Sequence, residues 1–113
     1  MKRTFAVVLL AAAILAGCSR GAAVPKYQPY IAGTITQIQS PRILVEEFPG
    51  EERGNKCWAA TNAKTVYLLQ EKNQVKQLEN PNLQVGQPVS VWSEAPVLES
   101  YPCQGGADVI LFR

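Results

Sequence analysis

The stretch YIAGTITQIQSPRILVEE, residues 30–47, decides the fold class of this chain. Its first ten residues are rich in β-branched side chains and alternate, so that Ile31 and Ile35 share one face of an extended segment. Pro41 interrupts this alternation, and a second apolar run covers residues 42–47. The stretch therefore predicts two consecutive β-strands.

Segments of the same kind recur towards the end of the chain, and together they predict an all-β domain. Further strands are expected at residues 57–61, 65–69, 88–94 and 107–113. Asn80-Pro81 is a usual start for one short helical turn. Because a small sheet must hide its edges, we expect a five-stranded OB-like barrel with that helical turn between strands 3 and 4. A two-sheet sandwich is the alternative.

The N-terminal residues have the features of a secretory signal. Lys2 and Arg3 precede an apolar run, residues 5–17, which is shorter than the roughly 20 residues that a transmembrane helix needs. The run ends in Leu15-Ala16-Gly17-Cys18, which resembles the bacterial lipobox. This resemblance implies cleavage before Cys18 and attachment of long acyl chains, such as palmitate, at that residue. An ordinary secretory peptide ending in cysteine and an uncleaved anchor are the alternatives.

Lipidation predicts a place in the cell envelope. Each buried methylene adds about 0.8 kcal/mol of membrane affinity, so two or three acyl chains hold the protein firmly. Ser19 stands where an aspartate would resemble an inner-membrane retention signal. We therefore expect the outer membrane, facing the periplasm, in a Gram-negative source, and the outer face of the plasma membrane in a Gram-positive one.

The expected organisation has three parts. These are a signal peptide at residues 1–17, the lipidated cysteine and a flexible tether at residues 18–29, and the β-domain at residues 30–113. The tether has no apolar period, and at coil or polyproline dimensions it would hold the domain roughly 20 to 35 Å from the bilayer.

Composition excludes several classes of function. Loss of Lys2 and Arg3 with the signal peptide brings the eleven basic residues level with the nine acidic ones, and a neutral domain has no electrostatic reason to bind nucleic acid. The sequence contains no histidine, which removes the commonest general base and most zinc sites. We therefore expect no enzyme activity, no metal and no cofactor.

Cys57 and Cys103 are the two cysteines left once Cys18 is lipidated. In an oxidising compartment such a pair most simply forms a structural disulfide. A redox pair is the alternative, although the C-x-x-C spacing typical of catalytic exchange is absent. Free thiols are expected if the source lacks an oxidative folding system.

A candidate ligand patch follows from the expected barrel. OB barrels bind chains across strands 2 and 3 and the loops beside them. The residues expected in this patch are Arg42, Trp58, Glu99, Ser100, Tyr101 and Gln104. Aromatic faces next to hydrogen-bonding side chains suit a glycan strand or a protein partner. The alternative is that Trp58 and Trp92 fill the barrel while Tyr101 packs over its end.

Several pieces of the sequence resemble one known family. They are Gly33-Thr34-Ile35, residues 42–45 (RILV), residues 83–92 (LQVGQPVSVW) and residues 99–102 (ESYP), followed by Ala107 and Ile110. In this order they resemble the DUF3221, or YobA-like, family of bacterial envelope proteins. The resemblance covers roughly residues 32–112 and implies a small OB-like β-domain, often lipid-anchored or secreted, without an established activity. Cys57 and Cys103 are not part of the family pattern.

The sequence alone thus favours a lipid-anchored binding or assembly module of the cell envelope. Its expected contacts are the membrane, through the lipid on Cys18, and an envelope protein or a glycan strand. A purely structural envelope lipoprotein is the second interpretation, and a thiol redox protein is the third. The residues Arg42, Trp58 and Tyr101 separate the first two, because a binding site requires these side chains to be exposed and to converge.

Overall fold

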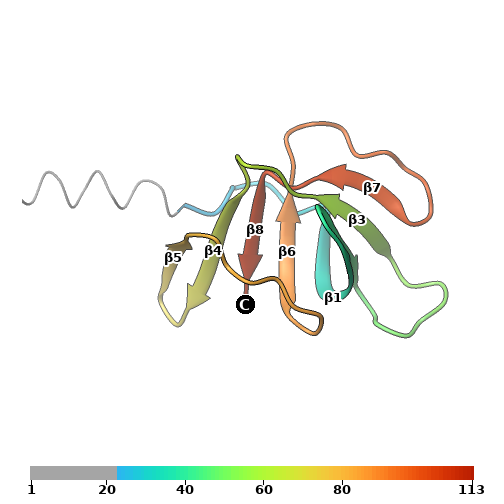
Figure 1. Ribbon diagram of the computed structural model, residues 1–113, viewed down its shortest axis with the longest axis horizontal. Coiled ribbons are helices and arrows are strands. Elements are labelled where there is room, and N and C mark those ends of the chain that lie inside the picture. Colours follow the sequence, from blue (N-terminus) through green and yellow to red (C-terminus); the bar gives the residue numbers. More distant parts are fainter. Residues whose placement is uncertain (1–22) are drawn as a thin grey trace, which may run out of the picture.

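The computed structural model describes residues 23–113, which form one eight-stranded sheet (Figure 1). The strands are β1 (Ile31–Gln39), β2 (Arg42–Glu46), β3 (Lys56–Ala60), β4 (Val66–Glu71), β5 (Gln74–Leu78), β6 (Pro88–Trp92), β7 (Cys103–Gly106) and β8 (Val109–Phe112). No helix long and apolar enough to cross a membrane occurs among these residues. The expected signal peptide and the lipidated Cys18 lie outside the described residues. The prediction of an all-β domain is confirmed.

The predicted closed five-stranded OB barrel is wrong, and so is the two-sheet sandwich. The strands form a single open sheet in the order β5-β4-β8-β6-β1-β2-β3-β7, with β5 and β7 as its edges. Both edge strands escaped prediction because they carry few apolar residues: β5 has the sequence QVKQL and β7 has the sequence CQGG. Edge strands of this kind are exposed on much of their surface, so they lack the apolar alternation of the central strands.

The predicted helical turn at residues 80–83 is absent as well. Within the polar segment 70–87, the chain instead reverses at Lys72, which has a positive φ of 32°, and β5 pairs antiparallel with β4. Asn80 has a φ of 49°, which lies in the left-handed region and is incompatible with the start of a right-handed helix. The Asn-Pro signal therefore marks a turn out of β5 rather than the beginning of a helix.

The C-terminal part of the chain forces the sheet to curl. β7 is an edge strand and β8 lies five positions away in the strand order, which would be about 24 Å in a flat sheet. The two strands are joined only by Ala107 and Asp108, a link that reaches about 10 Å at most. The backbone N–H of Ala107 donates to Ala60 in β3, and that of Asp108 donates to Trp92 in β6. The chain therefore changes partners within two residues, and the sheet bends around to allow it.

The curled sheet encloses the main core on its concave side. All eight strands contribute side chains to this core or pack against it. Fully buried residues such as Ile35, Val45 and Ile110 come from β1, β2 and β8. The main core comprises Ile31, Ile35, Ile43, Val45, Cys57, Ala59, Val89, Val91, Ala107, Ile110 and Phe112. Because apolar side chains from distant segments pack together in this core, strands of only four or five residues are long enough to form a stable sheet.

A second apolar cluster lies on the opposite face of the same strands. It is formed by Leu68, Trp92 and Leu111, with Val66, Val75, Val109 and Val24 packed against them. Along β8 the two clusters alternate, because Ile110 belongs to the main core and Leu111 to this outer cluster. Trp92 therefore does not fill a barrel interior, contrary to the alternative considered from the sequence.

Part of the segment expected as a flexible tether covers the outer cluster. We call residues 24–29 the N-terminal strap. Val24 packs against the outer cluster, and the Trp92 indole N–H donates a hydrogen bond to the carbonyl oxygen of Tyr27 at 2.7 Å. The strap is therefore attached to the sheet at two points, one apolar and one polar.

The cysteine pair joins the edge strand β7 to β3. Cys57 and Cys103 are directly opposite each other in the parallel β3–β7 register, with their Cα atoms 4.3 Å apart, and they form a disulfide. Cys57 is buried in the main core, whereas Cys103 is half-buried. The predicted disulfide is confirmed, and it fixes the four-residue edge strand that sequence patterning missed.

We predict that replacing Gly33 by alanine destabilises the domain by about 3 kcal/mol, because a Cβ there would overlap the backbone of β2 at Glu46. Gly33 lies where β1 stops pairing with β6 and begins pairing with β2. Denaturant unfolding of the soluble domain measures the change. Gly106→Ala is the matched control, because its added Cβ would meet Ser93 at an ordinary 3.6 Å. Equal stability of the two variants would contradict the steric argument.

We also predict that breaking the disulfide lowers the free energy of unfolding by about 4 kcal/mol, the chain-entropy estimate for closing the 46-residue interval. The measurement compares denaturant unfolding of the native protein, the reduced protein and the double variant Cys57→Ala/Cys103→Ala. Reductant should leave the double variant unchanged. Thiol titration of the native protein before reduction supplies the check, since two reactive thiols would contradict the pairing.

Candidate functional site

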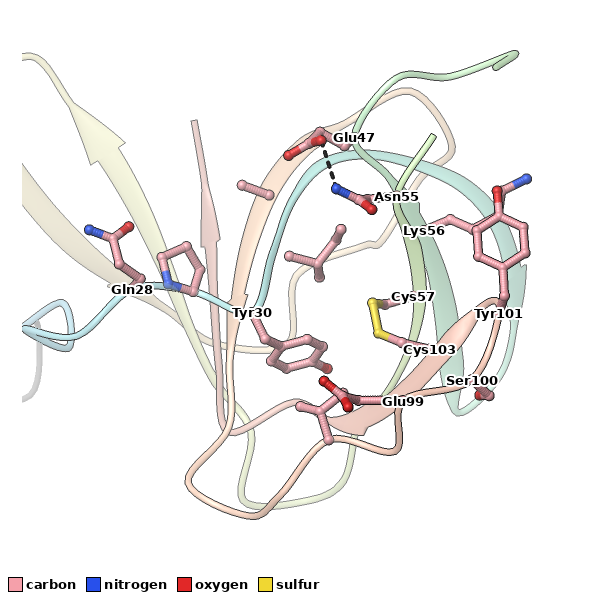
Figure 2. A pocket seen from close by; sticks show the side chains of 14 residues that line it. Gln28, Tyr30, Glu47, Asn55, Lys56, Cys57, Glu99, Ser100, Tyr101 and Cys103 are labelled. Atoms are coloured by element: carbon pink, nitrogen blue, oxygen red, sulfur yellow. Dashed lines mark hydrogen bonds between the residues drawn. A yellow bond between two sulfur atoms is a disulfide. The ribbon is translucent and has the colours of Figure 1, made fainter. Parts of the chain in front are cut away.

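An open groove of about 740 Å³ lies at one end of the curled sheet (Figure 2). One wall is the chain from Gln28 to Ala32, and the floor contains the disulfide. The opposite rim comes from the start of β3 and from the loop that leads into β7. The polar side chains that line it are Gln28, Glu47, Asn55, Lys56, Glu99, Ser100 and Tyr101. Half of the fourteen lining residues are polar, so the groove is more polar than the mainly apolar pockets that usually hold small ligands.

Tyr30 forms a rigid part of this groove. Its hydroxyl donates a hydrogen bond to the carbonyl oxygen of Gly106 at 2.6 Å, and its backbone N–H donates to Val91 at 3.0 Å. Burial, and then the negative charge of Asp108, raise the pKa of the Tyr30 hydroxyl above its ordinary value. The hydroxyl therefore stays protonated and acts as a structural donor.

A glycine in β7 makes room for the Tyr30 ring. A Cβ on Gly105 would lie 2.9 Å from the ring carbon Cζ of Tyr30 and 3.1 Å from a methyl group of Val97. Only glycine fits between these two side chains without displacing one of them. Gly105 and Gly106 thus belong to a strand that packs closely against an aromatic ring.

Tyr101 projects from the loop before β7 and remains 60% exposed. Its hydroxyl lies 2.5 Å from the carbonyl oxygen of Glu52 and 2.8 Å from that of Gly54, both in the β2–β3 loop. The Lys56 ammonium lies 5.5 Å from the centre of the Tyr101 ring, and Figure 2 shows the two side chains together at the rim of the groove. This geometry is a cation–π contact. Through its hydroxyl, Tyr101 links the loop before β7 to the β2–β3 loop, and one side of its ring remains accessible.

Arg42 and Trp58 form a second contact of the same kind. The guanidinium carbon of Arg42 lies 4.1 Å from the centre of the Trp58 ring. A guanidinium nitrogen of Arg42 also donates to the side-chain oxygen of Gln39 at 3.1 Å. Trp58 is half-buried and is not part of the main core. The alternative in which Trp58 fills the barrel is therefore wrong.

The two contacts lie along one face of β3. Lys56 and Trp58 are two residues apart in this strand, so their side chains point the same way about 6.6 Å apart. Gln104 of β7 is the neighbour of Trp58 in the parallel register and is exposed. We call the row Tyr101, Lys56, Trp58 and Arg42 the cation–aromatic stripe. It runs from the rim of the groove across β3 to β2.

The structure divides the predicted patch between two adjoining surfaces. Arg42, Trp58 and Tyr101 belong to the stripe, and Gln104 lies beside it. Glu99 and Ser100 instead line the groove. Tyr101 lines the groove as well and therefore connects the two surfaces.

Sequence reasoning missed several contributors to these surfaces, including Gln28 and Tyr30 in the wall of the groove. Lys56 belongs to both of them, and its alternation with Trp58 along β3 is the signal that would have found it. Asn55 and Glu47 line the groove and are joined by a hydrogen bond of 3.1 Å, shown dashed in Figure 2. No local pattern indicates this pair, because it depends on where the β2–β3 loop closes.

The site brings together several kinds of polar and charged groups. It offers carboxylate acceptors, an amide, a hydroxyl and two cations held against aromatic rings. Among residues 23–113, no three His, Cys, Asp or Glu side chains come together in a way that could hold a metal ion. The groups present are suited to hydrogen bonds and to cation–aromatic contacts with a bound molecule.

Comparison with known proteins gives one result. A family model described as "Protein of unknown function (DUF3221)" matches residues 32–110, which is most of the chain. Neither the curated proteins nor the solved structures yield a match. The matched segment begins just before the Gly33 position and includes both the stripe and the groove loop. The chain belongs to the DUF3221 family.

Proposed function

We propose that this member of the DUF3221 family is a lipid-anchored binding module of the cell envelope, with the cation–aromatic stripe and the adjoining groove as its binding surface. The observation that carries the proposal is the double cation–aromatic pairing, Arg42 on Trp58 and Lys56 on Tyr101, along one face where Tyr101 is exposed and the other three side chains are half-buried. Tyrosine, tryptophan and arginine are the residues that most often dominate binding energy at interfaces.

The stripe is organised before any partner arrives. Long cationic side chains lose about 0.5 to 1.5 kcal/mol each when an interface immobilises them. Here Arg42 is already held by Trp58 and Gln39, and Tyr101 is already held by the β2–β3 loop. Preorganisation of this kind lowers the cost of binding, and it favours recognition over a purely structural role.

The proposed location has two supports. The lipobox-like Leu15-Ala16-Gly17-Cys18 follows a secretory signal in the sequence. The Cys57–Cys103 disulfide is typical of an oxidising compartment outside the cytoplasm. We accordingly place the protein on the outer membrane facing the periplasm in a Gram-negative source, or on the outer face of the plasma membrane in a Gram-positive one.

We propose an envelope protein as the partner, rather than a glycan strand. One face of each aromatic ring is covered by a cation of the chain itself, so less ring surface is left for a stacked sugar. The guanidinium of Arg42 and the ammonium of Lys56 are half-buried, and both suit carboxylates or backbone carbonyls of a polypeptide. A glycan ligand and a purely structural role are the outcomes that the test must separate from this one.

We expect Tyr101→Ala and Arg42→Ala each to reduce recovery of a specific envelope protein about tenfold, the effect of losing one moderate hot spot. The measurement is crosslinking in intact cell envelopes followed by affinity purification and mass spectrometry. Gln77→Ala is the control, because Gln77 is an exposed polar residue but lies in β5 at the other end of the strand order. Thermal unfolding of each variant confirms that the fold is retained.

Two outcomes would contradict the proposal. Identical partner lists for wild type, Tyr101→Ala and Arg42→Ala would remove the stripe from any binding role and leave a structural one. Sedimentation of the purified domain with isolated cell-wall glycan, abolished by Arg42→Ala, would instead assign the surface to a glycan.

A further inference from the structure

The attachment of the N-terminal strap determines how an anchored domain sits on its membrane. This inference rests on the proposed lipidation of Cys18. The first described contact of the chain with the sheet is at Val24, which packs against the outer cluster. Tyr27 follows, bonded through its carbonyl oxygen to the Trp92 indole. The chain is therefore fixed to the outer face of β4, β6 and β8 before it enters β1.

The distance between lipid and sheet is consequently short. Val24 is six residues after Cys18, and six residues span at most about 21 Å when fully extended. A tether that remained free as far as Pro29 would have nearly twice this reach. The outer cluster must therefore stay close to the bilayer that holds the acyl chains.

The stripe lies on a different side of the molecule. The outer cluster and the stripe both lie on the outer, convex face of the curled sheet. Because the sheet curls around the main core, they lie on opposite sides of that core. The outer cluster belongs to β4, β6 and β8, whereas the stripe belongs to β2, β3 and the loop before β7. Figure 1 shows β4 and β5 at one end of the domain and β3 and β7 at the other.

The two ends of the domain also differ in charge. The strap and the β4–β5 hairpin with its flanks carry four exposed lysines and two glutamates: Lys26, Lys64, Lys72 and Lys76, with Glu71 and Glu79. The segments around the groove and the stripe are rich in carboxylates, with six glutamates (Glu46, Glu47, Glu51, Glu52, Glu94 and Glu99) against three basic residues (Arg42, Arg53 and Lys56). Lysines near an anionic lipid surface are attracted to it, while glutamates are repelled.

We infer that the β4–β5 end of the domain, together with the strap, rests against anionic phospholipid headgroups, and that the stripe and groove point away from the membrane. The short leash from Cys18 to Val24 and the distribution of lysines and glutamates both favour this orientation. The partner of the stripe is then a protein of the aqueous space or of the opposite surface.

The test uses the full-length lipidated protein in vesicles of phosphatidylethanolamine and phosphatidylglycerol. A small fluorophore is attached to a cysteine introduced either at Gln77, on β5, or at Gln104, on β7; both positions are exposed and lie on the convex face. A lipid with a nitroxide on its headgroup quenches fluorophores close to the surface. We expect quenching at position 77 to exceed that at position 104 at least about twofold, because only the lysine-bearing end contacts headgroups.

Equal quenching at the two positions, or stronger quenching at position 104, would overturn the inference. A second protein with a flexible ten-residue insertion between Ala23 and Val24 should lose most of the difference, and an unchanged difference would show that the short leash does not orient the domain. The mass of the N-terminal peptide separates the two proposals. Absence of lipid on Cys18 refutes the anchor itself, whereas equal quenching of a lipidated protein refutes the orientation alone.

Discussion

The architecture depends on one local constraint, the change of partner that the chain makes at Ala107 and Asp108. Within these two residues the backbone leaves β3 and joins β6. Ala107 is completely buried, so the crossing takes place inside the molecule and a larger side chain would have to displace the main core. The curl that follows from the crossing gives the sheet an inside, and the inside accommodates the apolar residues of eight short strands.

The site inherits its geometry from the same constraint. Because β7 runs parallel to β3, Gln104 lies beside Trp58, and the loop that precedes β7 brings Tyr101 back over Lys56. The disulfide fixes this arrangement at the level of single residues. A four-residue strand containing two glycines would otherwise contribute little to its own stability. The proposed binding surface thus lies on the least regular part of the sheet and is supported by a covalent bond.

Local patterns in the sequence predict the strands whose own residues carry an apolar or alternating pattern. β1, β2 and β6 alternate or are apolar throughout, and their bounds agree with the expected ones to within two residues. Neither edge strand has such a pattern, since β5 buries no residue fully and β7 consists of CQGG. The closed barrel was wrong for a related reason. Strand number and strand order depend on pairings between distant segments, and no single segment encodes them.

The candidate site was predictable by residue type but not by position. Arg42, Trp58 and Tyr101 were identified because aromatic and cationic residues near flanking loops suit binding. Lys56 was missed because a lone lysine at the start of a strand is usually just solvated. Its role depends on Tyr101, which lies 45 positions later in the sequence. For Trp92, the alternative of a place in the barrel interior is wrong. Its indole N–H needs a hydrogen-bond partner and finds it in the strap rather than in the core.

The position of the disulfide also bears on how the protein meets proteases in its surroundings. The loop that it closes contains every residue from 57 to 103, so a single cut in the exposed segment 93–100 would leave both fragments joined and the sheet paired. The β2–β3 loop at residues 47–55 is just as exposed but lies outside the closed loop. A cut there would separate β1 and β2 from the rest of the chain, with no covalent bond to retain them. The molecule is thus tolerant to nicking on one side of its groove and vulnerable on the other.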